Sequence, residues 1–408
     1  MFKLQPLTHF LLASGLTFGA CTTAAWAQSE TLRNEVLRPL QAAQELNRQK
    51  KAELALQKFA EIDALSPGSP LEIFTTERLR ATVLLAAGQS LEAAKALDKA
   101  LQTERGTVPE RLVLMEHLAQ LQYNAKAYPD AAMWAGRYLA LGGQREQFRA
   151  LQAQALYLSG QYLSATEVLQ QAVQRDLDAR RPPDELSLRM LANAHQQLKS
   201  ETGYVRALEL LVRYYPKPEL WTDLVARHMR LNNVPVHLEI DGYRLLQQVG
   251  AGTNASEAIE HAQLAITAGF PAEARQALER AQPAADPEES RKVQTLLGEA
   301  RRLQQEDERQ LAQTENLLAK ARDGNPWVNM GLNLALSGQA ARGVTLMRQG
   351  LDKGGLRQPA AARLRMGHAQ LLAGQRDAAR AVFDALGSEN VPESVLARLW
   401  LLHLDAQR

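Results

Sequence analysis

The sequence contains very little cysteine and few aromatic residues, and both shortages limit the folds that it can adopt. Cys21 is the single cysteine among 408 residues, so no disulfide can form within one chain. Aromatic residues make up 5% of the sequence, although apolar residues as a whole make up 46%. A β-sandwich uses many β-branched and aromatic residues, whereas abundant alanine and leucine suit close packing between helices. The composition therefore favours an all-α protein that is stabilised by apolar packing alone.

The chain also lacks an excess of charge of either sign. It carries 47 Lys and Arg residues against 45 Asp and Glu residues, which gives a formal net charge of +2. A general nucleic-acid-binding protein needs a basic excess along one face, because it must neutralise phosphates. We therefore expect no nucleic-acid partner.

Sequence signatures of catalysis and of metal or cofactor binding are missing. No histidine pairs with another histidine or a cysteine at metal-ligand spacing, and there is neither a glycine-rich phosphate loop nor a G-x-S-x-G elbow. Acidic residues are plentiful, but no pair stands out from the solvated helix faces. We expect no cofactor, no metal and no enzymatic activity. An envelope enzyme or glycan-handling factor built on helical repeats stays open as an alternative, and it would need convergent acids in a groove.

The first 27 residues have the organisation of a signal peptide. Lys3 precedes an apolar stretch at residues 10–20, and Ala25-Trp26-Ala27 follows as a small-x-small cleavage signal. The apolar stretch is too short to span a bilayer comfortably. These features predict export, cleavage after Ala27, a periplasmic location and no transmembrane segment in the mature chain.

Cys21 leaves a second possibility for the same segment. Residues 18–21 read Phe-Gly-Ala-Cys and are similar to a bacterial lipobox, which would make the protein an outer-membrane lipoprotein. The Ala-Trp-Ala site is the better match, because Phe18 replaces the usual leucine. Intact-mass measurement of protein purified from the envelope should give a chain that starts at Gln28. A diacylated chain that starts at Cys21 would overturn this prediction.

A phrase that begins with glycine and continues as a short alanine-rich helix recurs along the chain. Gly338 and Gly374 are 36 residues apart, and Gly88 and Gly160 are separated by twice that distance. A period of this length is typical of stacked helical hairpins, none of which buries its apolar face alone. The phrases are GQSLEAAKALDKAL from Gly88, GQYLSATEVLQQAV from Gly160, GFPAEARQALERAQ from Gly269, GQAARGVTLMRQGL from Gly338 and GQRDAARAVFDALG from Gly374.

The pattern divides the chain into four parts. The signal peptide (1–27) precedes repeats at 28–283, and further repeats with a capping helix occupy 324–408. Residues 284–323 are rich in charge, and their apolar spacing predicts two helices or one long kinked helix, either as a degenerate repeat or as a hinge. Within the last part, Gly331 and Gly367 occupy equivalent positions at which two helices approach closely. Leucine at either position should cost about 1–3 kcal/mol through overpacking.

With these positions laid out, the chain resembles the tetratricopeptide repeat family. The resemblance covers most of the sequence after residue 27 and is close in the repeats that contain the five glycine phrases. It implies an α-solenoid of stacked antiparallel hairpins in a right-handed superhelix, a concave groove, protein or peptide binding, and no catalysis. Three phrases, at 215–221, 268–274 and 326–327, look like an exported proteobacterial branch of the family. Some members of that branch accompany TonB-type energy-transducing systems, which would make the partner part of an envelope complex.

The resemblance also implies which residues would contact a partner, because the first helix of each repeat lines the groove. Asn329 and Asn333 in one repeat, and Arg365 and His368 in the next, lie near these positions. Asn329 and Arg365 hold the same repeat position, so stacking would place them side by side, where they could bind a peptide backbone and a carboxylate. The alternative is that all four simply solvate a helix face. In either case, alanine at Asn329 and Arg365 should change stability by less than about 0.5 kcal/mol.

Overall fold

The computed structural model describes residues 31–406, and the regular secondary structure of that part is entirely helical. The predicted signal peptide and Cys21 lie outside the described residues. The chain separates after Ala125 into two compact units, which we describe one at a time. Within the described part, no helix is both long enough and apolar enough to cross a membrane.

The first unit consists of helical hairpins, and two of its helices begin at capping boxes. Ser69 and Glu72 form a capping box at the start of one helix, and Thr107 and Glu110 form another. In each box the two side chains satisfy backbone N–H groups that a helix start leaves unpaired. The helices are α1 (Asn34–Arg48), α2 (Ala52–Asp63), α3 (Pro70–Ala86), α4 (Ser90–Gln102) and α5 (Val108–Asn124).

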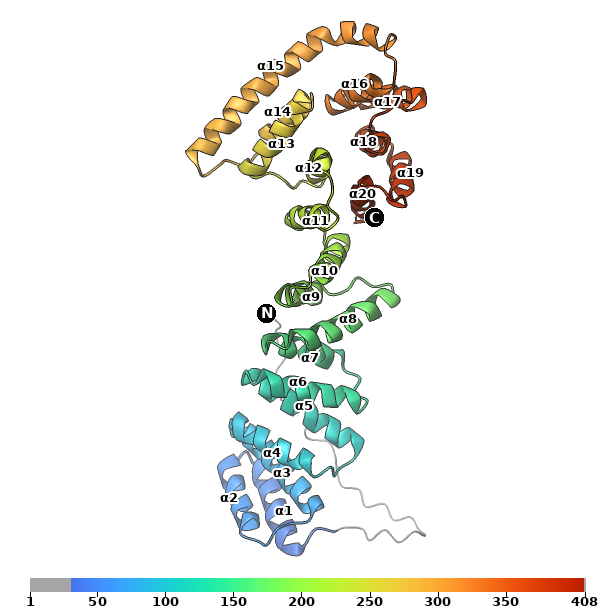
Figure 1. Ribbon diagram of the computed structural model, residues 1–408. Helices are drawn as coiled ribbons and strands as arrows, with labels where there is room; N and C mark the ends of the chain where they lie inside the picture. Colours follow the sequence, from blue (N-terminus) through green and yellow to red (C-terminus); the bar gives the residue numbers. More distant parts are fainter. Residues whose placement is uncertain (1–30, 407–408) are drawn as a thin grey trace. The chain divides into compact units, whose positions relative to one another are not determined.

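The second unit contains the remaining helices, and most consecutive helices within it pack against each other (Figure 1). A continuous apolar core runs from α12 to α18 and includes Ile240, Phe270 and Met347. The helices are α6 (Tyr128–Ala140), α7 (Glu146–Leu158), α8 (Tyr162–Asp178), α9 (Glu185–Gln197), α10 (Glu201–Tyr214), α11 (Pro218–Leu231), η1 (Val236–Leu238), α12 (Glu239–Gln248), α13 (Ala255–Thr267), α14 (Pro271–Glu279), α15 (Pro287–Leu318), α16 (Asn325–Leu336), α17 (Ala340–Lys353), α18 (Pro359–Leu372), α19 (Arg376–Gly387) and α20 (Glu393–Ala406). The fold is thus the all-α stack of antiparallel hairpins that the repeat period predicts.

The recurring glycines mark the turns within hairpins, as the repeat pattern predicts. All five have a positive φ between 74° and 91°, and each follows the end of a first helix. Glycine adopts this left-handed conformation without the steric penalty that a Cβ atom brings, so it ends the helix and lets the chain reverse.

The charge-rich segment contains one long helix, which is one of the two arrangements that its apolar spacing predicts. α15 runs without interruption for 32 residues, from Pro287 to Leu318. Its buried residues Val293, Leu297 and Ala300 join the core beside α13 and α14, and Leu318 packs against Met330 and Leu334 of α16. The helix therefore bridges two neighbouring hairpins along its length (Figure 1). Most of its charged residues are exposed.

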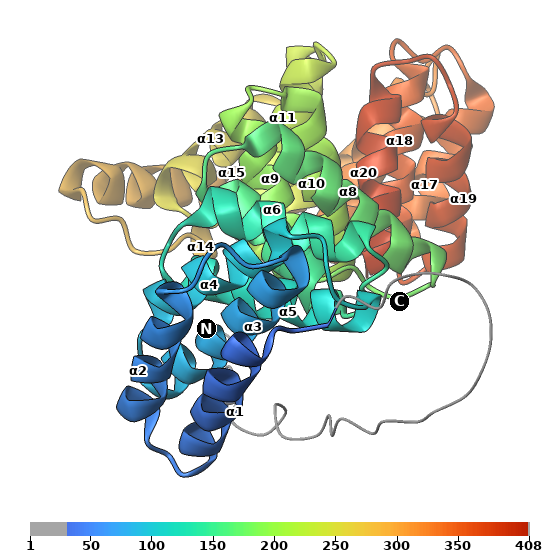
Figure 2. The same cartoon turned by 90° about the horizontal axis from the view of Figure 1, so that it is seen from below.

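The last helix, which the sequence pattern predicts as a terminal cap, also packs against helices that are distant in the sequence. α20 packs against α10, α11 and α12 as well as against α18 and α19. Figures 1 and 2 both show it beside α10 and α18. The rings of Trp221 on α11 and His403 on α20 lie 6.0 Å apart, and Trp400 stacks on Phe383 at 5.5 Å. The helices from α10 to α20 therefore close on themselves, a contact between distant segments that no repeat period encodes.

Candidate functional site

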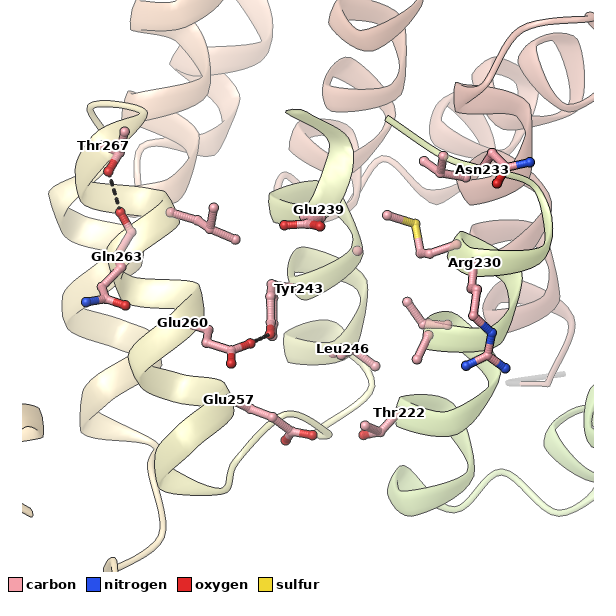
Figure 3. Close-up of a pocket in the computed structure, with 16 residues that line it drawn as sticks. Thr222, Arg230, Asn233, Glu239, Tyr243, Leu246, Glu257, Glu260, Gln263 and Thr267 are labelled. Carbon is pink, nitrogen blue, oxygen red and sulfur yellow. Dashed lines mark hydrogen bonds between the residues drawn. The ribbon is translucent and has the colours of Figure 1, made fainter. Parts of the chain in front are cut away.

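A cavity of about 860 Å³ lies among α11, α12 and α13 (Figure 3). Each helix contributes one face, because its lining residues recur at the spacing of helical turns. Val225 and Met229 come from α11, Leu246 from α12 and Leu264 from α13, and together they supply apolar surface. The polar lining includes three acidic residues, Glu239, Glu257 and Glu260, together with Tyr243 and other polar side chains, among them one cation, Arg230.

Two further cavities adjoin the first. The second, of about 520 Å³, is formed mainly by η1, α12, α13, α16 and α18, and it shares Leu264 and Thr267 with the first. The third, of about 670 Å³, lies between α15, α16 and the turn after α13, and it shares Ala268, Phe270 and Asn329 with the second. We call these three connected cavities the central groove. Its middle cavity is lined by α13, α16 and α18, which are first helices of their hairpins, as the tetratricopeptide resemblance implies.

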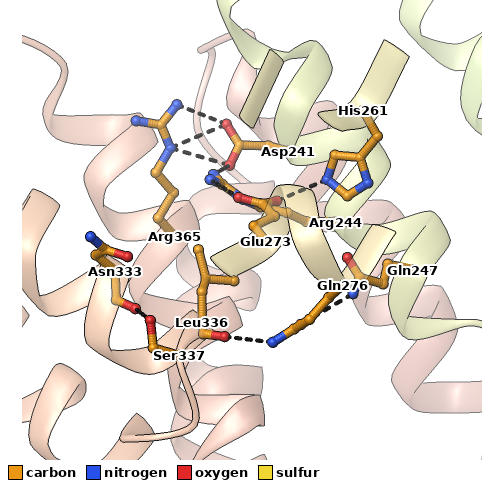
Figure 4. A network of polar contacts seen from close by, with 10 residues as sticks. All are labelled: Asp241, Arg244, Gln247, His261, Glu273, Gln276, Asn333, Leu336, Ser337 and Arg365. Atoms are coloured by element: carbon orange, nitrogen blue, oxygen red, sulfur yellow. Dashed lines mark hydrogen bonds and ion pairs between the residues drawn. The ribbon is translucent and has the colours of Figure 1, made fainter. Parts of the chain in front are cut away.

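A buried charge network stands directly behind the groove (Figure 4). Arg244 donates to both carboxylate oxygens of Glu273 at 2.8 and 2.9 Å and to Asp241 at 2.6 Å. Arg365, from α18, donates to the same Asp241 at 3.0 to 3.2 Å. Nε2 of His261 lies 2.9 Å from Glu273, on the remaining side of that carboxylate. The network connects α12, α13, α14 and α18, so it fixes the helices that shape the groove.

The charged groups of the network are almost completely buried, and they pair with one another. Asp241 and Arg244 are each 2% exposed, and Glu273 is fully buried. Burial alone would raise the pKa of Glu273, but Arg244 and His261 lower that pKa to about 2. Because Glu273 is therefore ionised at neutral pH and can only accept, His261 Nε2 donates the proton in their hydrogen bond. Burial opposes the charge of Arg244, yet its two carboxylate partners raise its pKa above the ordinary value.

The structure places Asn329 and Asn333 on the central groove. Asn329 is exposed and lines both the second and the third cavity. Asn333 lines the third cavity, where its side-chain amide donates to Asp307 of α15 at 3.1 Å. Asn329 and Arg365 line the same cavity, so stacking does bring them together. Their role in partner binding stays a prediction.

Arg365 and His368 differ from the exposed polar residues that the sequence suggested. Arg365 is 16% exposed, and its guanidinium is held by Asp241. Its replacement would remove a charge partner from a buried carboxylate, so the expectation of unchanged stability does not hold for Arg365. His368 is 6% exposed and stacks on Trp400 at 5.2 Å. Burial, and then the charge of Arg244, lower the pKa of His368 to about 4. At neutral pH, therefore, it is an uncharged interior residue.

Sequence reasoning missed the acidic residues of the first cavity and the network behind it. It found no convergent acids, but the structure gathers Glu239, Glu257 and Glu260 around one cavity. The one available signal was Asp241 and Arg244, an acid and a base three residues apart on α12.

Within residues 31–406, no three His, Cys, Asp or Glu side chains are arranged to hold a metal ion. No family model matches the chain, and neither does any curated protein.

Solved structures that align with the chain include several tetratricopeptide repeat proteins. The TPR2AB domain of yeast Sti1, in a complex with pHSP90, is 15% identical, and the alignment covers 74% of this chain and 100% of that one with a TM-score of 0.25. A tetratricopeptide repeat protein from Parabacteroides merdae is 13% identical over 82% and 99% of the two chains, with a TM-score of 0.27. Yeast Tom70 is 12% identical over 91% and 95%, with a TM-score of 0.25. At such TM-scores the superpositions transfer no site, and the fold assignment depends on the hairpins themselves.

Proposed function

We propose that the chain is a protein-interaction scaffold of the tetratricopeptide type that binds a peptide segment of a partner in the central groove. The observation that carries the proposal is the row of three adjoining cavities. The first and second share Leu264 and Thr267, and the second and third share Ala268, Phe270 and Asn329. An elongated site with apolar surface and separate polar groups suits a chain segment better than a compact ligand. The buried network behind the groove supports the proposal, because a fixed site loses less conformational entropy on binding.

The three glutamates of the first cavity also meet the condition that a helical-repeat enzyme would have to meet. Two observations favour binding over catalysis there. Glu239 and Glu260 are exposed residues, whereas catalytic carboxyl groups gain their properties from burial away from water. The Glu260 carboxylate is also engaged, since it accepts a hydrogen bond from the Tyr243 hydroxyl at 2.6 Å.

The proposal includes a periplasmic location for the scaffold. Its support is the order of Lys3, the apolar stretch and Ala25-Trp26-Ala27 in the sequence. The partner would then belong to the cell envelope, and a TonB-type complex is one candidate. An outer-membrane lipoprotein anchored through Cys21 is the alternative. The intact mass of the mature chain separates the two.

A bulky residue within the groove should abolish partner binding without unfolding the protein. Thr267 is exposed, lines both the first and the second cavity, and donates its hydroxyl to the Gln263 carbonyl at 2.8 Å. Thr267→Trp should reduce the affinity for a groove-binding peptide at least about tenfold, because the indole occupies the shared part of the two cavities. Fluorescence anisotropy with a labelled peptide selected on the wild-type chain measures the change.

Thr345→Trp on α17 is the matched control. Thr345 is also an exposed helical threonine, its hydroxyl donates to the Ala341 carbonyl at 3.1 Å, and it lies outside all three cavities of the groove. Affinity should be unchanged in this variant. Equal affinities of both variants and the wild type would show that the central groove is not the binding surface.

A further inference from the structure

The first cavity of the central groove combines apolar surface with three negatively charged side chains. Glu257 and Glu260 are three residues apart on α13, so their side chains are neighbours on the helix surface. Glu239 lies at the start of α12 and lines the same cavity, and Figure 3 shows the three carboxylates spaced along the gap between α12 and α13. Like charges one helical turn apart repel each other. The fold therefore maintains an unfavourable arrangement that a cation would relieve.

The negative charge of the cavity is not neutralised by the protein. Among residues 31–406, the carboxylates of Glu239 and Glu257 have no hydrogen-bond or ion-pair partner, and Glu260 accepts only from Tyr243. Burial, the bond to Glu260 and the charges of all three glutamates raise the pKa of Tyr243. Arg230 is the one cationic residue among the described lining residues, and Glu201, outside the cavity, holds its guanidinium at 2.5 Å.

We propose that this cavity binds a lysine or arginine side chain of the partner peptide, together with an adjacent aliphatic side chain. The inference rests on the proposed function, because it names the chemistry of the segment that the groove takes. The aliphatic residue would pack on Val225, Met229 and Leu264, and the cation would lie among the free carboxylates. Both requirements follow from charge complementarity and from burial of apolar surface. An acidic peptide is disfavoured, since it would bring like charges together.

The test uses the full chain and a library of random dodecapeptides displayed on phage. Panning against the wild-type protein should enrich peptides in which Lys or Arg stands beside Leu, Ile, Val or Met. An enriched peptide is then synthesised with a fluorescent label, and in a second form with citrulline or norleucine in place of the cation. The uncharged form should bind at least about tenfold more weakly in anisotropy titrations.

Variants of the protein test whether the preference for a cationic peptide comes from the first cavity. The double variant Glu239→Gln and Glu257→Gln should bind the cationic peptide at least about tenfold more weakly than the wild type. Its affinity for the uncharged form of the peptide should be nearly unchanged. The control double variant, Glu53→Gln with Glu167→Gln, removes the same charge from two exposed glutamates outside the groove and should bind like the wild type.

The possible failures can be told apart. If enriched peptides lose affinity in Thr267→Trp but show no preference for cations, or if both double variants behave alike, the basic-peptide inference is wrong and the groove function stands. If no peptide is enriched, or if Thr267→Trp leaves affinity unchanged, the proposed function itself fails and the inference fails with it.

Discussion

Replacement of Arg244 by methionine is expected to lower the free energy of unfolding of the second unit by about 3–5 kcal/mol. Methionine has a similar length and can pack in the same space, but it leaves Asp241 and Glu273 without the guanidinium that bridges them. Two buried carboxylates would then depend on Arg365 and His261 alone, and each must be protonated or hydrated at a cost in free energy. Urea unfolding followed by circular dichroism at pH 7 measures the loss.

The control for this prediction is another arginine whose ion pair lies in water. Arg189 on α9 forms a pair with Glu185 one helical turn away, and its side chain is 44% exposed. Arg189→Met should change stability by less than about 1 kcal/mol. Adding Glu273→Leu to Arg244→Met should restore part of the lost stability, because it removes one of the uncompensated charges. Equal stabilities of Arg244→Met and Arg189→Met would contradict the network.

The second large effect is expected at Gly331, where two helices of one hairpin touch. A Cβ atom at Gly331 would lie 2.6 Å from the Gly343 carbonyl oxygen and 2.8 Å from the Met347 backbone nitrogen. Backbone atoms cannot move aside without separating α16 from α17, so Gly331→Leu should cost about 3 kcal/mol or more. The midpoint of urea unfolding is the measurement.

Two matched substitutions serve as comparisons for Gly331→Leu. At Gly367 the nearest atoms belong to the Phe383 ring, which can rotate or shift, so Gly367→Leu should cost less, about 1–2 kcal/mol. At Gly298 on α15, a Cβ atom would meet nothing within 4 Å, so Gly298→Leu should stabilise the helix by up to about 1 kcal/mol. If all three variants have the same stability, close helix approach does not explain the glycines of the repeat.

The local features of the fold could be predicted from the sequence because they depend on residues close together in the chain. The glycine turns at Gly88, Gly160 and Gly374 need only a left-handed residue after a helix, and the apolar periodicity between turns defines the hairpins. Close contact at Gly331 could likewise be predicted, because the two helices of a hairpin are neighbours in sequence.

The closure of the second unit could not be predicted in the same way. Arg365 and Asp241 are 124 residues apart, and nothing in the repeat pattern couples them. For this reason Arg365 had the pattern of an exposed groove residue, although it completes a buried ion pair. His368 had the same pattern, and only the packing of α20 places Trp400 over its ring. The acids of the first cavity come from two helices, so their convergence also requires the three-dimensional arrangement.

Site-specific photo-cross-linking tests the central claim, binding in the groove, most directly. Benzoylphenylalanine is placed at Asn329, which is exposed and lies where the second and third cavities meet, or at Thr345 on α17, outside the groove. A fluorescent peptide selected on the wild-type chain is added, the sample is irradiated, and covalent complexes are identified by intact mass. We predict a cross-link from position 329 and none from position 345. A peptide that binds both variants but cross-links only from position 345 would contradict the account.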